Sequence, residues 1–572
     1  MNKYVLLVLL ASIGYGCDGP GRTVRPNTAS AETLQSLGVT IGSLCELMGY
    51  DSVRLKGHAL VWGLPDTGSG ECPPFVKEYL NQHIQKLKSR GFIPEQYANM
   101  TAEQIISNRS TAVVGVSGIV PAGAPKGSRF DVDVSIPWST QTTSLQGGRL
   151  FLTELQQVVP GLSGRLIAGR SSAFAYGPLF INPFPLSADS SQRVDPRRAV
   201  VLGGGRTSID RQIQLALLNP DSSIAQQIQK RINSRFKPPD GTKVADAVNR
   251  SVINITVPKR YRERYHHFLQ LLLSMYLQEG AAFQEIKLKE LSEMANQEGA
   301  DYETVALAWE AIGRNALKDL ESCYRVITGK KAFYAARAAL ELEDRKAIDA
   351  LIKMAEDNHH PCRELAIQVL ARAADDVRGG ACLSRLLKSP NARVRLLAYS
   401  GLRHSKNRRV RTTVLPYEFQ LDSINTTGES LICIWAICDT VSSLPTDKGE
   451  PRIIIFGRNL YCRRNVFFET PEKTVMVNAG VGGDKLTISR QISGKGDYVT
   501  IQSPRAVEDL ILAMARPLHP KNKKQKAGAG LTFSQIIGIL YQLCERRVIP
   551  SRFILLRKPE DIFQSQVKVP VL

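Results

Sequence analysis

The order of hydrophobic and polar positions predicts a β-rich first half of the chain. Two glycine-rich blocks with strand-type alternation, Val53–Glu71 and Asn108–Leu155, flank a stretch with helical spacing at residues 72–95. Alternation continues through residues 165–218 and returns in V-I-N-I-T-V-P, Val252 to Pro258. We therefore expect several strands joined by glycine-containing turns, with few helices between them.

Several polar positions in this half raise questions of chemistry. In F-D-V-D-V-S, which begins at Phe130, the apolar side chains share one face and Asp131 and Asp133 share the other. Two aspartates at this spacing could bind a metal or form a catalytic pair, but solvent-facing positions on a half-buried strand are favoured. The run G-G-G-R at Gly203–Arg206 matches neither G-x-G-x-x-G nor a phosphate loop with its lysine, so we expect a turn there. Asp221 or Ser222 is expected to cap the helix that follows.

The spacing becomes helical throughout from about Tyr265 to His404. The sequence C-R-E-L-A at Cys362–Ala366 recurs as V-R-L-L-A at Val394–Ala398, and the preceding helices are offset by 33 residues. A repeat of this length with small residues at packed positions indicates stacked helical hairpins, and it resembles HEAT repeats over about 330–405. Such a stack presents a surface to partners and has no chemistry of its own.

Strand signals return after a basic linker, Arg403–Arg411. Residues 412–505 contain short apolar runs typical of strands, and a second basic linker, Lys521–Lys526, follows them. The apolar positions between Leu531 and Leu543 lie on one helix face, and F-I-L-L at Phe553–Leu556 predicts a closing strand.

The amino end, M-N-K-Y-V-L-L-V-L-L-A-S-I-G-Y-G-C, has the order typical of a secretory signal over residues 1–17. Cys17 directly follows a small residue, which indicates a lipoprotein-type site with Cys17 as the lipidated first residue; ordinary cleavage nearby is the alternative. The apolar run is too short to span a bilayer, and no later apolar run reaches about 18 residues. Residues 18–50 are expected to be a tether and a short helix, helical around Ala31–Met48.

The length, net charge and cysteines of the chain further limit what it can be. At 572 residues and 43% hydrophobic content, the chain should hold about three or four domains with real cores. The formal charge of +21 indicates anionic surroundings. For an exported protein these are wall polymer and lipid headgroups, so we expect no nucleic-acid partner, although solubility alone explains the charge equally well. One disulfide, between Cys45 and Cys72, is predicted, and nothing has the paired spacing of a zinc site.

A search for catalytic residues gives no convincing pattern. The histidine pairs His266–His267 and His359–His360 consist of neighbours that point about 100° apart on a helix, so they are poor joint ligands and are interpreted as surface residues. Neither G-x-S-x-G nor H-E-x-x-H occurs. We therefore expect no enzymatic activity, no cofactor and no metal, and a wall hydrolase is the least favoured hypothesis.

Three blocks of this chain resemble the bacterial flagellar P-ring protein family. G-H-A-L-V-W-G-L-P-D-T-G-S-G is similar to the family's G-Y-G-L-V-V-G-L-x-G-T-G-D, with His58 and Ala59 as departures. V-V-G-V-S-G-I-V-P-A-G-A-P-K-G-S-R-F-D-V-D-V-S follows the family's alternation of strand, Pro, Gly and Asp-Val, and S-L-Q-G-G-R-L-F-L-T-E-L resembles S-L-R-G-G-T-L-L-M-T-P-L. Together with a weaker tail, the likeness covers roughly 50–260 and 530–556. The positions expected to serve the fold or assembly are Gly57, Gly63, Gly68, Gly70, Pro121, Gly127, Asp131, Gly147 and Gly148.

The resemblance implies an α+β multidomain chain. A P-ring-like body over 51–262 would be interrupted by the HEAT-like insertion at 263–405, with the β-rich domain at 412–505 and a C-terminal helix and strand at 527–572. It also implies a structural, non-enzymatic subunit that forms a homo-oligomeric ring in the periplasm, around the flagellar rod, with rod and outer ring proteins and peptidoglycan as partners. A lipid on Cys17, which the amino-terminal residues indicate, would anchor the protein to a membrane and would be a departure from the family. The alternative is a cell-envelope lipoprotein, unrelated to motility, that uses the helical surface for docking.

Overall fold

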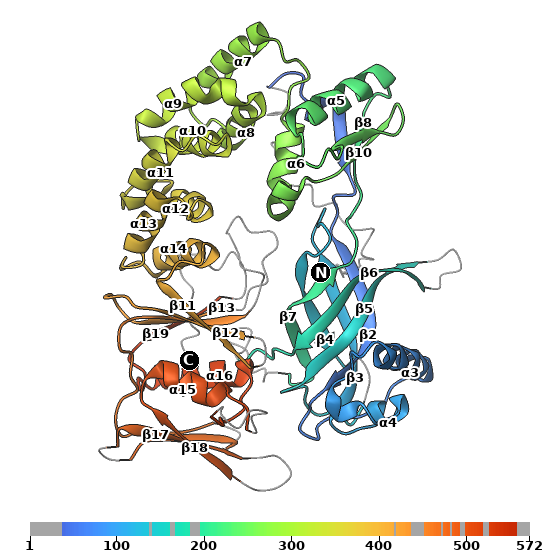
Figure 1. Cartoon of the computed structure of the whole chain (residues 1–572), viewed down its shortest axis with the longest axis vertical. Helices are drawn as coiled ribbons and strands as arrows, with labels where there is room; N and C mark the ends of the chain where they lie inside the picture. The colour runs from blue at the N-terminus through green and yellow to red at the C-terminus, as the bar shows by residue number, and fades with distance from the viewer. Residues whose placement is uncertain are drawn as a thin grey trace, which may run out of the picture.

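The computed structural model describes residues 37–136, 140–160, 166–183, 195–416, 419–435, 451–470, 473–480, 483–491, 498–518 and 526–556. Within these ranges a β-rich first part is followed by a helical middle and by two further sheets (Figure 1). This is the α+β multidomain class expected from the sequence.

Six antiparallel strands of the first part close into a barrel. The strands follow the order β2-β3-β4-β7-β6-β5 around it, and every neighbouring pair is antiparallel. Their alternating side chains fill the inside, where Val61, Val114, Val132 and Leu155 are at most 1% exposed. Closure leaves no free strand edge in this region. The strands are β2 (Val53–Trp62), β3 (Thr111–Val120), β4 (Arg129–Ser135), β5 (Arg149–Pro160), β6 (Leu166–Pro178) and β7 (Arg198–Thr207).

Two helices cover one outer face of the barrel. In α3 (Pro74–Ser89), Val76, Leu80 and Ile84 pack with outward side chains of the barrel strands. The short η1 (Glu95–Tyr97) and α4 (Ala102–Ile106) complete this second layer, and the helix at 72–95 was expected from its spacing.

A small sheet, in the order β1-β8-β10-β9, lies above the barrel in Figure 1. Its helix α5 is capped by Asp221, whose carboxylate accepts hydrogen bonds from two backbone N–H groups, as predicted. Residues 45–48, expected to be helical, instead form β1, because this segment pairs with β8. The elements are α2 (Ile41–Leu44), β1 (Cys45–Met48), β8 (Ile213–Leu217), α5 (Ser222–Arg235), β9 (Ala245–Ala247) and β10 (Val252–Ile255).

The middle of the chain consists of packed helices. Small residues allow close approach: Ala335 and Ala336 are fully buried, and a Cβ on Gly401 would lie 2.5 Å from the Cα of Ala371 on a neighbouring helix. The elements are η2 (Lys259–Arg264), α6 (Tyr265–Leu273), α7 (Ala281–Met294), α8 (Tyr302–Ile312), η3 (Arg314–Ala316), α9 (Leu317–Arg325), α10 (Gly329–Glu341), α11 (Ala347–Glu356), α12 (Arg363–Arg372), α13 (Val377–Leu386) and α14 (Ala392–His404). Their likeness to HEAT repeats stays a prediction.

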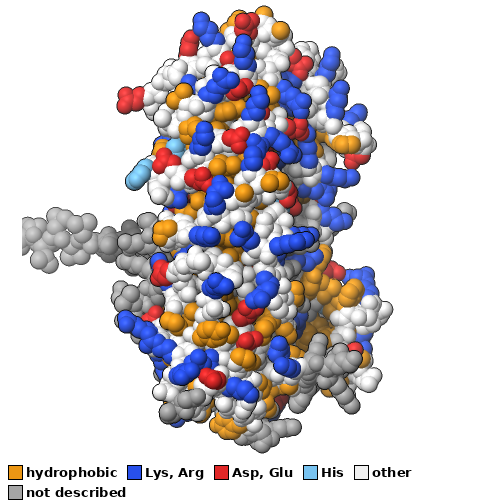
Figure 2. All heavy atoms as spheres, turned by 60° about the vertical axis from the view of Figure 1, so that its left-hand side comes forward, with side chains coloured by type: hydrophobic (Ala, Val, Ile, Leu, Met, Phe, Trp, Pro, Cys, Tyr) orange, Lys and Arg blue, Asp and Glu red, His pale blue; other side chains and the backbone are white. Residues whose placement is uncertain are grey.

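The charge of the chain lies outside this helical part. Residues 263–405 contain twenty acidic and twenty basic residues, so they add nothing to the net charge of +21. On the face shown in Figure 2, Lys and Arg side chains are intermixed with Asp and Glu. Arg378 pairs with Asp349 at 2.7 Å and Arg385 pairs with Glu356 at 2.6 Å, which links α13 to α11. Exposed pairs of this kind each contribute little to stability.

Two sheets with two helices between them form the carboxyl-terminal part (Figure 1). One sheet has the order β11-β12-β14-β13-β19, where β19 lies parallel to β13, and the other has the order β15-β16-β17-β18. The helix α15 was not foreseen. The elements are β11 (Val410–Leu415), β12 (Phe419–Ile424), β13 (Leu431–Trp435), β14 (Arg452–Phe456), β15 (Phe467–Glu469), β16 (Val475–Asn478), β17 (Lys485–Gln491), β18 (Tyr498–Pro504), α15 (Val507–Ala515), α16 (Phe533–Glu545) and β19 (Arg552–Leu556).

The barrel and the carboxyl-terminal part contact each other directly. The helices of the middle part connect them in the chain and form the upper part of Figure 1. The Phe533 ring of α16 lies 5.8 Å from the ring of Phe180 and 5.0 Å from that of Phe419. The N–H of Ile181 donates a 3.0 Å hydrogen bond to the hydroxyl of Ser534. Among the described helices, none has the length and apolar character needed to cross a bilayer.

Candidate functional site

Three of the motif glycines meet where β2 ends and β5 begins. Gly63 and Gly147 have φ angles of +78° and +81°, which residues other than glycine rarely adopt. A Cβ on Gly148 would lie 2.5 Å from Cγ1 of Val61. Gly63 and Gly147 therefore allow turns of the backbone, and Gly148 allows close packing against Val61 of the same subunit.

Gly68 and Gly70 belong to the same rim of the barrel. A Cβ on Gly68 would lie 1.9 Å from the carbonyl oxygen of Thr111, and one on Gly70 would lie 2.5 Å from that of Ile106. The N–H of Gly68 donates a 2.8 Å hydrogen bond to the carbonyl of Arg109. Both glycines let the loop after β2 lie directly on the segment between α4 and β3.

The remaining motif positions lie at the other rim or in the wall. Pro121 follows β3, and Gly127 precedes β4 with a φ of +87° while its N–H bonds the carbonyl of Thr207 at 2.9 Å. Gly57 lies within β2, where a Cβ would be 2.8 Å from the carbonyl oxygen of Glu154. The nine motif positions thus do not form one surface.

Asp131 has a defined partner on the next strand. Phe130, Val132 and Val134 are buried on the inner face of β4, as predicted. Asp131 lies on the other face, and its Oδ1 accepts a 2.7 Å hydrogen bond from the N–H of Gly203. It therefore holds β4 against β7, whereas Asp133 is exposed.

The predicted turn at Gly203–Arg206 is wrong, because these residues form part of β7 in the barrel wall. A Cβ on Gly205 would lie 2.5 Å from the ring of Phe130, and one on Gly204 would lie 2.2 Å from Cγ1 of Val201. Glycine is needed here because large neighbouring side chains fill the space that a side chain would take.

A cavity of about 310 Å³ lies between the outer barrel wall and the carboxyl-terminal part. Two sequence motifs meet there: the S-L-Q-G-G-R loop supplies Gly147 to Arg149, and the G-G-G-R run of β7 supplies Gly203, Gly204 and Arg206. The other described lining residues are Arg129, Tyr176, Gly177, Pro178, Leu179, Phe180, Val201, Leu202, Val414, Phe419, Gln420, Pro451, Thr532 and Phe533.

Three half-buried arginines, Arg129, Arg149 and Arg206, give this cavity its charge. The guanidinium of Arg149 lies 5.6 Å from the ring centre of Trp62, and that of Arg206 lies 5.7 Å from the ring centre of Tyr176. The described lining residues include no Asp or Glu. We call this site the arginine cavity.

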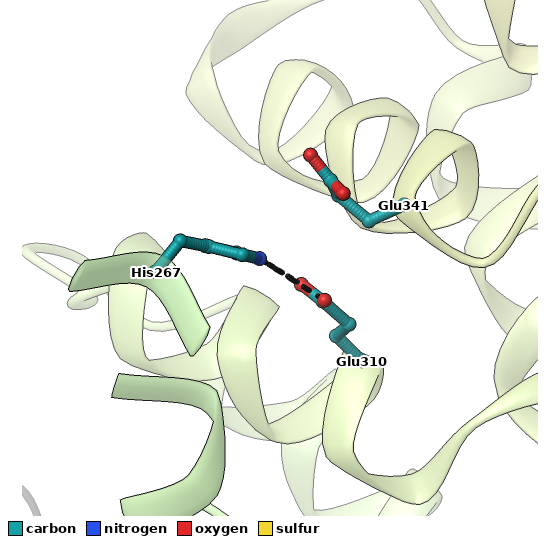
Figure 3. A group of neighbouring side chains, drawn as sticks. All are labelled: His267, Glu310 and Glu341. Atoms are coloured by element: carbon teal, nitrogen blue, oxygen red, sulfur yellow. Dashed lines mark hydrogen bonds and ion pairs between the residues drawn. The ribbon is translucent and has the colours of Figure 1, made fainter. Parts of the chain in front are cut away.

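A second cluster of ionisable side chains joins three helices (Figure 3). His267 of α6 points toward Glu310 of α8, with 3.0 Å between Nε2 and a carboxylate oxygen, and Glu341 of α10 lies nearby. One potential ligand atom from each residue lies within 4.8 Å of the other two. These residues are 43 and 31 positions apart in sequence. The sequence marked His267 only as the neighbour of His266, and no motif linked it to Glu310 or Glu341.

The charges around this cluster favour an ion-pair network over a metal site. Nη1 of Arg264 lies 2.6 Å from both carboxylate oxygens of Glu341. Burial raises the pKa of Glu341, but the charges of His267, Arg264 and Arg372 outweigh this effect and hold the pKa below its usual value. The guanidinium of Arg264 already occupies the carboxylate of Glu341, to which a metal ion would have to bind. A divalent ion would also place further positive charge beside Arg264 and Arg372, which is unfavourable.

The histidines were expected at the surface, and for three of the four this is wrong. His266 and His267 are half-buried, and His360 is 7% exposed, with Nδ1 accepting a 3.1 Å hydrogen bond from the N–H of Cys362. Only His359 is exposed. His266 bonds the hydroxyl of Tyr50 while its neighbour bonds Glu310, so adjacent histidines do serve separate partners.

The predicted disulfide is also absent. Cys45 is buried in the small sheet and Cys72 is half-buried near α3, and both are free thiols. Cys17, the predicted lipidation site, lies outside the described residues.

Comparison with known proteins finds matches for the first part of the chain. The family described as flagellar P-ring protein matches residues 40–290. A flagellar P-ring protein from Aquifex aeolicus is 28% identical over 231 residues, which is 40% of this chain and 58% of that protein. Similar proteins occur in Ruegeria pomeroyi, 29% identical over 34% of this chain and 51% of the relative, and in Cereibacter sphaeroides, 31% identical over 33% and 50%.

The matched region includes the barrel, the small sheet and the first helices, and it begins at residue 40, within the expected tether. The chain spans about half the length of the curated relatives it matches. The remaining helices and the carboxyl-terminal sheets lie outside the match. Over residues 40–290 the chain is therefore similar to flagellar P-ring proteins, at 26–31% identity.

Proposed function

We propose that this protein is a non-enzymatic, structural subunit of the flagellar P ring. In this role it assembles with copies of itself in the periplasm, surrounds the rod and contacts peptidoglycan and the outer ring. The observation that carries the proposal is the family match over the barrel and small sheet. The predicted secretory signal at residues 1–17 supports export, and the charge of +21 suits anionic polymer and headgroups.

A ring needs one surface on each subunit that fits a different surface on the next. The barrel is closed, and Gly57, Gly68, Gly70 and Gly148 are packed against atoms of the same subunit. We therefore expect neighbouring subunits to meet through outer faces of the barrel or through the small sheet, whose edge strands β1 and β9 are open among the described strands.

Gene deletion combined with electron microscopy of basal bodies tests this proposal. Deletion should abolish swimming and remove a ring density from purified basal bodies, and the full chain supplied in trans should restore both. Normal swimming with an unchanged basal body would reject the ring function. Loss of envelope integrity in the same strain would favour a docking lipoprotein, for which the helical part outside the family match is the specific support.

Lipidation of Cys17 is proposed as an additional anchor. Labelling with a radioactive fatty acid should mark the wild-type protein and leave Cys17→Ser unlabelled. Equal absence of label in both proteins would reject the anchor without affecting the ring proposal.

A further inference from the structure

Two loops of the carboxyl-terminal part lie side by side, one between β14 and β15 and the other after α16. The N–H of Arg463 donates a 2.8 Å hydrogen bond to the carbonyl of Val548, so the backbones of the two loops are joined. The guanidinium of Arg546 lies 5.1 Å from the ring centre of Phe468, which ties the end of α16 to β15. Both loops lie outside residues 40–290, so the likeness to P-ring proteins does not account for what they present.

Arginine and aromatic side chains of these loops face solvent together. Cys462, Val466 and Phe468 are buried in the core of this part, and the residues next to them in sequence point outward. Tyr461 is 47% exposed and Phe467 is 64% exposed, which is unusual for large aromatic side chains. We call the exposed set the basic aromatic surface: Tyr461, Arg463, Arg464, Phe467, Arg546 and Arg547.

Positive charge dominates the two loops. Residues 457–466 and 545–550 contain five arginines, all exposed, and one acidic residue, Glu545. Arg464 also pairs with Asp484 at 3.5 Å, but the two side chains are 62% and 80% exposed, so this pair contributes little and is easily exchanged for another anion. The aromatic contact of Arg546 leaves its charge in place.

We propose that the basic aromatic surface docks on a membrane that carries anionic lipid headgroups. The negative potential of such a membrane attracts arginines that lie close to it. The exposed rings favour a bilayer over a dissolved anionic polymer, because the membrane interface accepts aromatic rings and removes their apolar surface from water. Tyr461 and Phe467 flank Arg463 and Arg464 in the same loop, so both kinds of contact can form at once.

Cosedimentation of the full-length protein with lipid vesicles tests this inference. All samples carry Cys17→Ser, so that no lipid on the protein anchors it. We expect binding to vesicles of phosphatidylglycerol and phosphatidylcholine in equal parts to be about tenfold or more tighter than binding to phosphatidylcholine alone, and high salt should remove this preference. Arg463→Gln combined with Arg464→Gln should weaken binding to the anionic vesicles about tenfold or more, because each arginine contributes about fivefold.

Arg378→Gln combined with Arg385→Gln is the matched control for charge. It removes the same two positive charges from exposed positions on α13, so binding to the anionic vesicles should change less than about twofold. Equal weakening by the two arginine pairs would mean that only the net charge matters and would overturn the proposal. Equal binding to the two kinds of vesicle would overturn it as well.

Phe467→Ala tests the aromatic contribution and should weaken binding to the anionic vesicles about threefold or more. Phe75→Ala on α3 is its control, because Phe75 is 67% exposed and lies on the barrel side of the molecule, so its loss should leave binding unchanged. Each replaced side chain is exposed, and thermal unfolding without vesicles should therefore match that of the parent protein. An unchanged affinity of Phe467→Ala would refute membrane docking and favour a dissolved anionic polymer. None of these measurements depends on ring formation.

Discussion

Gly68→Ala distinguishes a glycine that packs inside the subunit from one that serves a contact between subunits. The new Cβ would lie 1.9 Å from the carbonyl oxygen of Thr111 and 2.8 Å from that of Arg109, so the loop must move by more than an ångström. Overpacking of this kind costs about 1–3 kcal/mol, and loss of the hydrogen bond from the Gly68 N–H to Arg109 costs about 1 kcal/mol more. We expect a local destabilisation of roughly 3 kcal/mol.

Hydrogen exchange of the β3 amides, measured by mass spectrometry on unassembled full-length protein, reports this change. A loss of roughly 3 kcal/mol corresponds to about a hundredfold faster exchange where local opening governs it. Gly127→Ala is the control: its φ of +87° is unfavourable for alanine, but no atom lies within 4 Å of the new Cβ. It should cost only about 1 kcal/mol. If Gly68→Ala leaves β3 protection unchanged but blocks assembly, the glycine acts between subunits and our reasoning is refuted.

Three further changes test other parts of the structure. Asp422 is fully buried and accepts a 3.0 Å hydrogen bond from Nε of Arg403, so Asp422→Ala should cost about 3–5 kcal/mol. The loss should appear as a lower denaturation midpoint of the carboxyl-terminal part, followed by Trp435 fluorescence with the other three tryptophans replaced by phenylalanine. Asp131→Ala removes the acceptor of the Gly203 N–H and should cost about 1–3 kcal/mol locally, which corresponds to roughly 5- to 150-fold faster exchange of β7 amides. Burial lowers the pKa of His266 from 6.5 to about 4, so its neutral form is favoured in the folded state; stability is full above pH 6.5 and falls as pH drops toward 4. In denaturation series at successive pH values, His266→Gln should flatten this decline, and an unchanged slope would contradict the assignment.

The elements that the sequence predicted well are those with a strong local pattern. The strand at Phe130 and the cap at Asp221 follow from alternation and from the preference of helix starts for aspartate. The face of α16 and the strand β19 likewise match the expected Leu531–Leu543 helix and Phe553–Leu556 strand. In each case the residues that specify the element are neighbours along the chain.

The errors fall where a distant partner overrides the local pattern. Residues 45–48 have helical spacing but form the strand β1, because their backbone pairs with the antiparallel strand β8. The glycines of Gly203–Arg206 suggest a turn, yet they are needed because Phe130, more than seventy positions earlier, fills the barrel beside them. His266 and His267 were expected in solvent, but both are half-buried: His266 contacts Tyr50, which lies more than two hundred positions earlier, and His267 contacts Glu310 of α8.

By itself, the sequence determined the α+β class, the resemblance of the first part to P-ring proteins and a set of motif glycines, because periodicity, capping and motif spacing are local properties. Only the tertiary structure decided what those glycines are for, and it brought Arg129, Arg149 and Arg206 into one cavity and His267, Glu310 and Glu341 into one network. The physical reason is that barrel closure and helix stacking join residues whose separation in sequence carries no signal of contact.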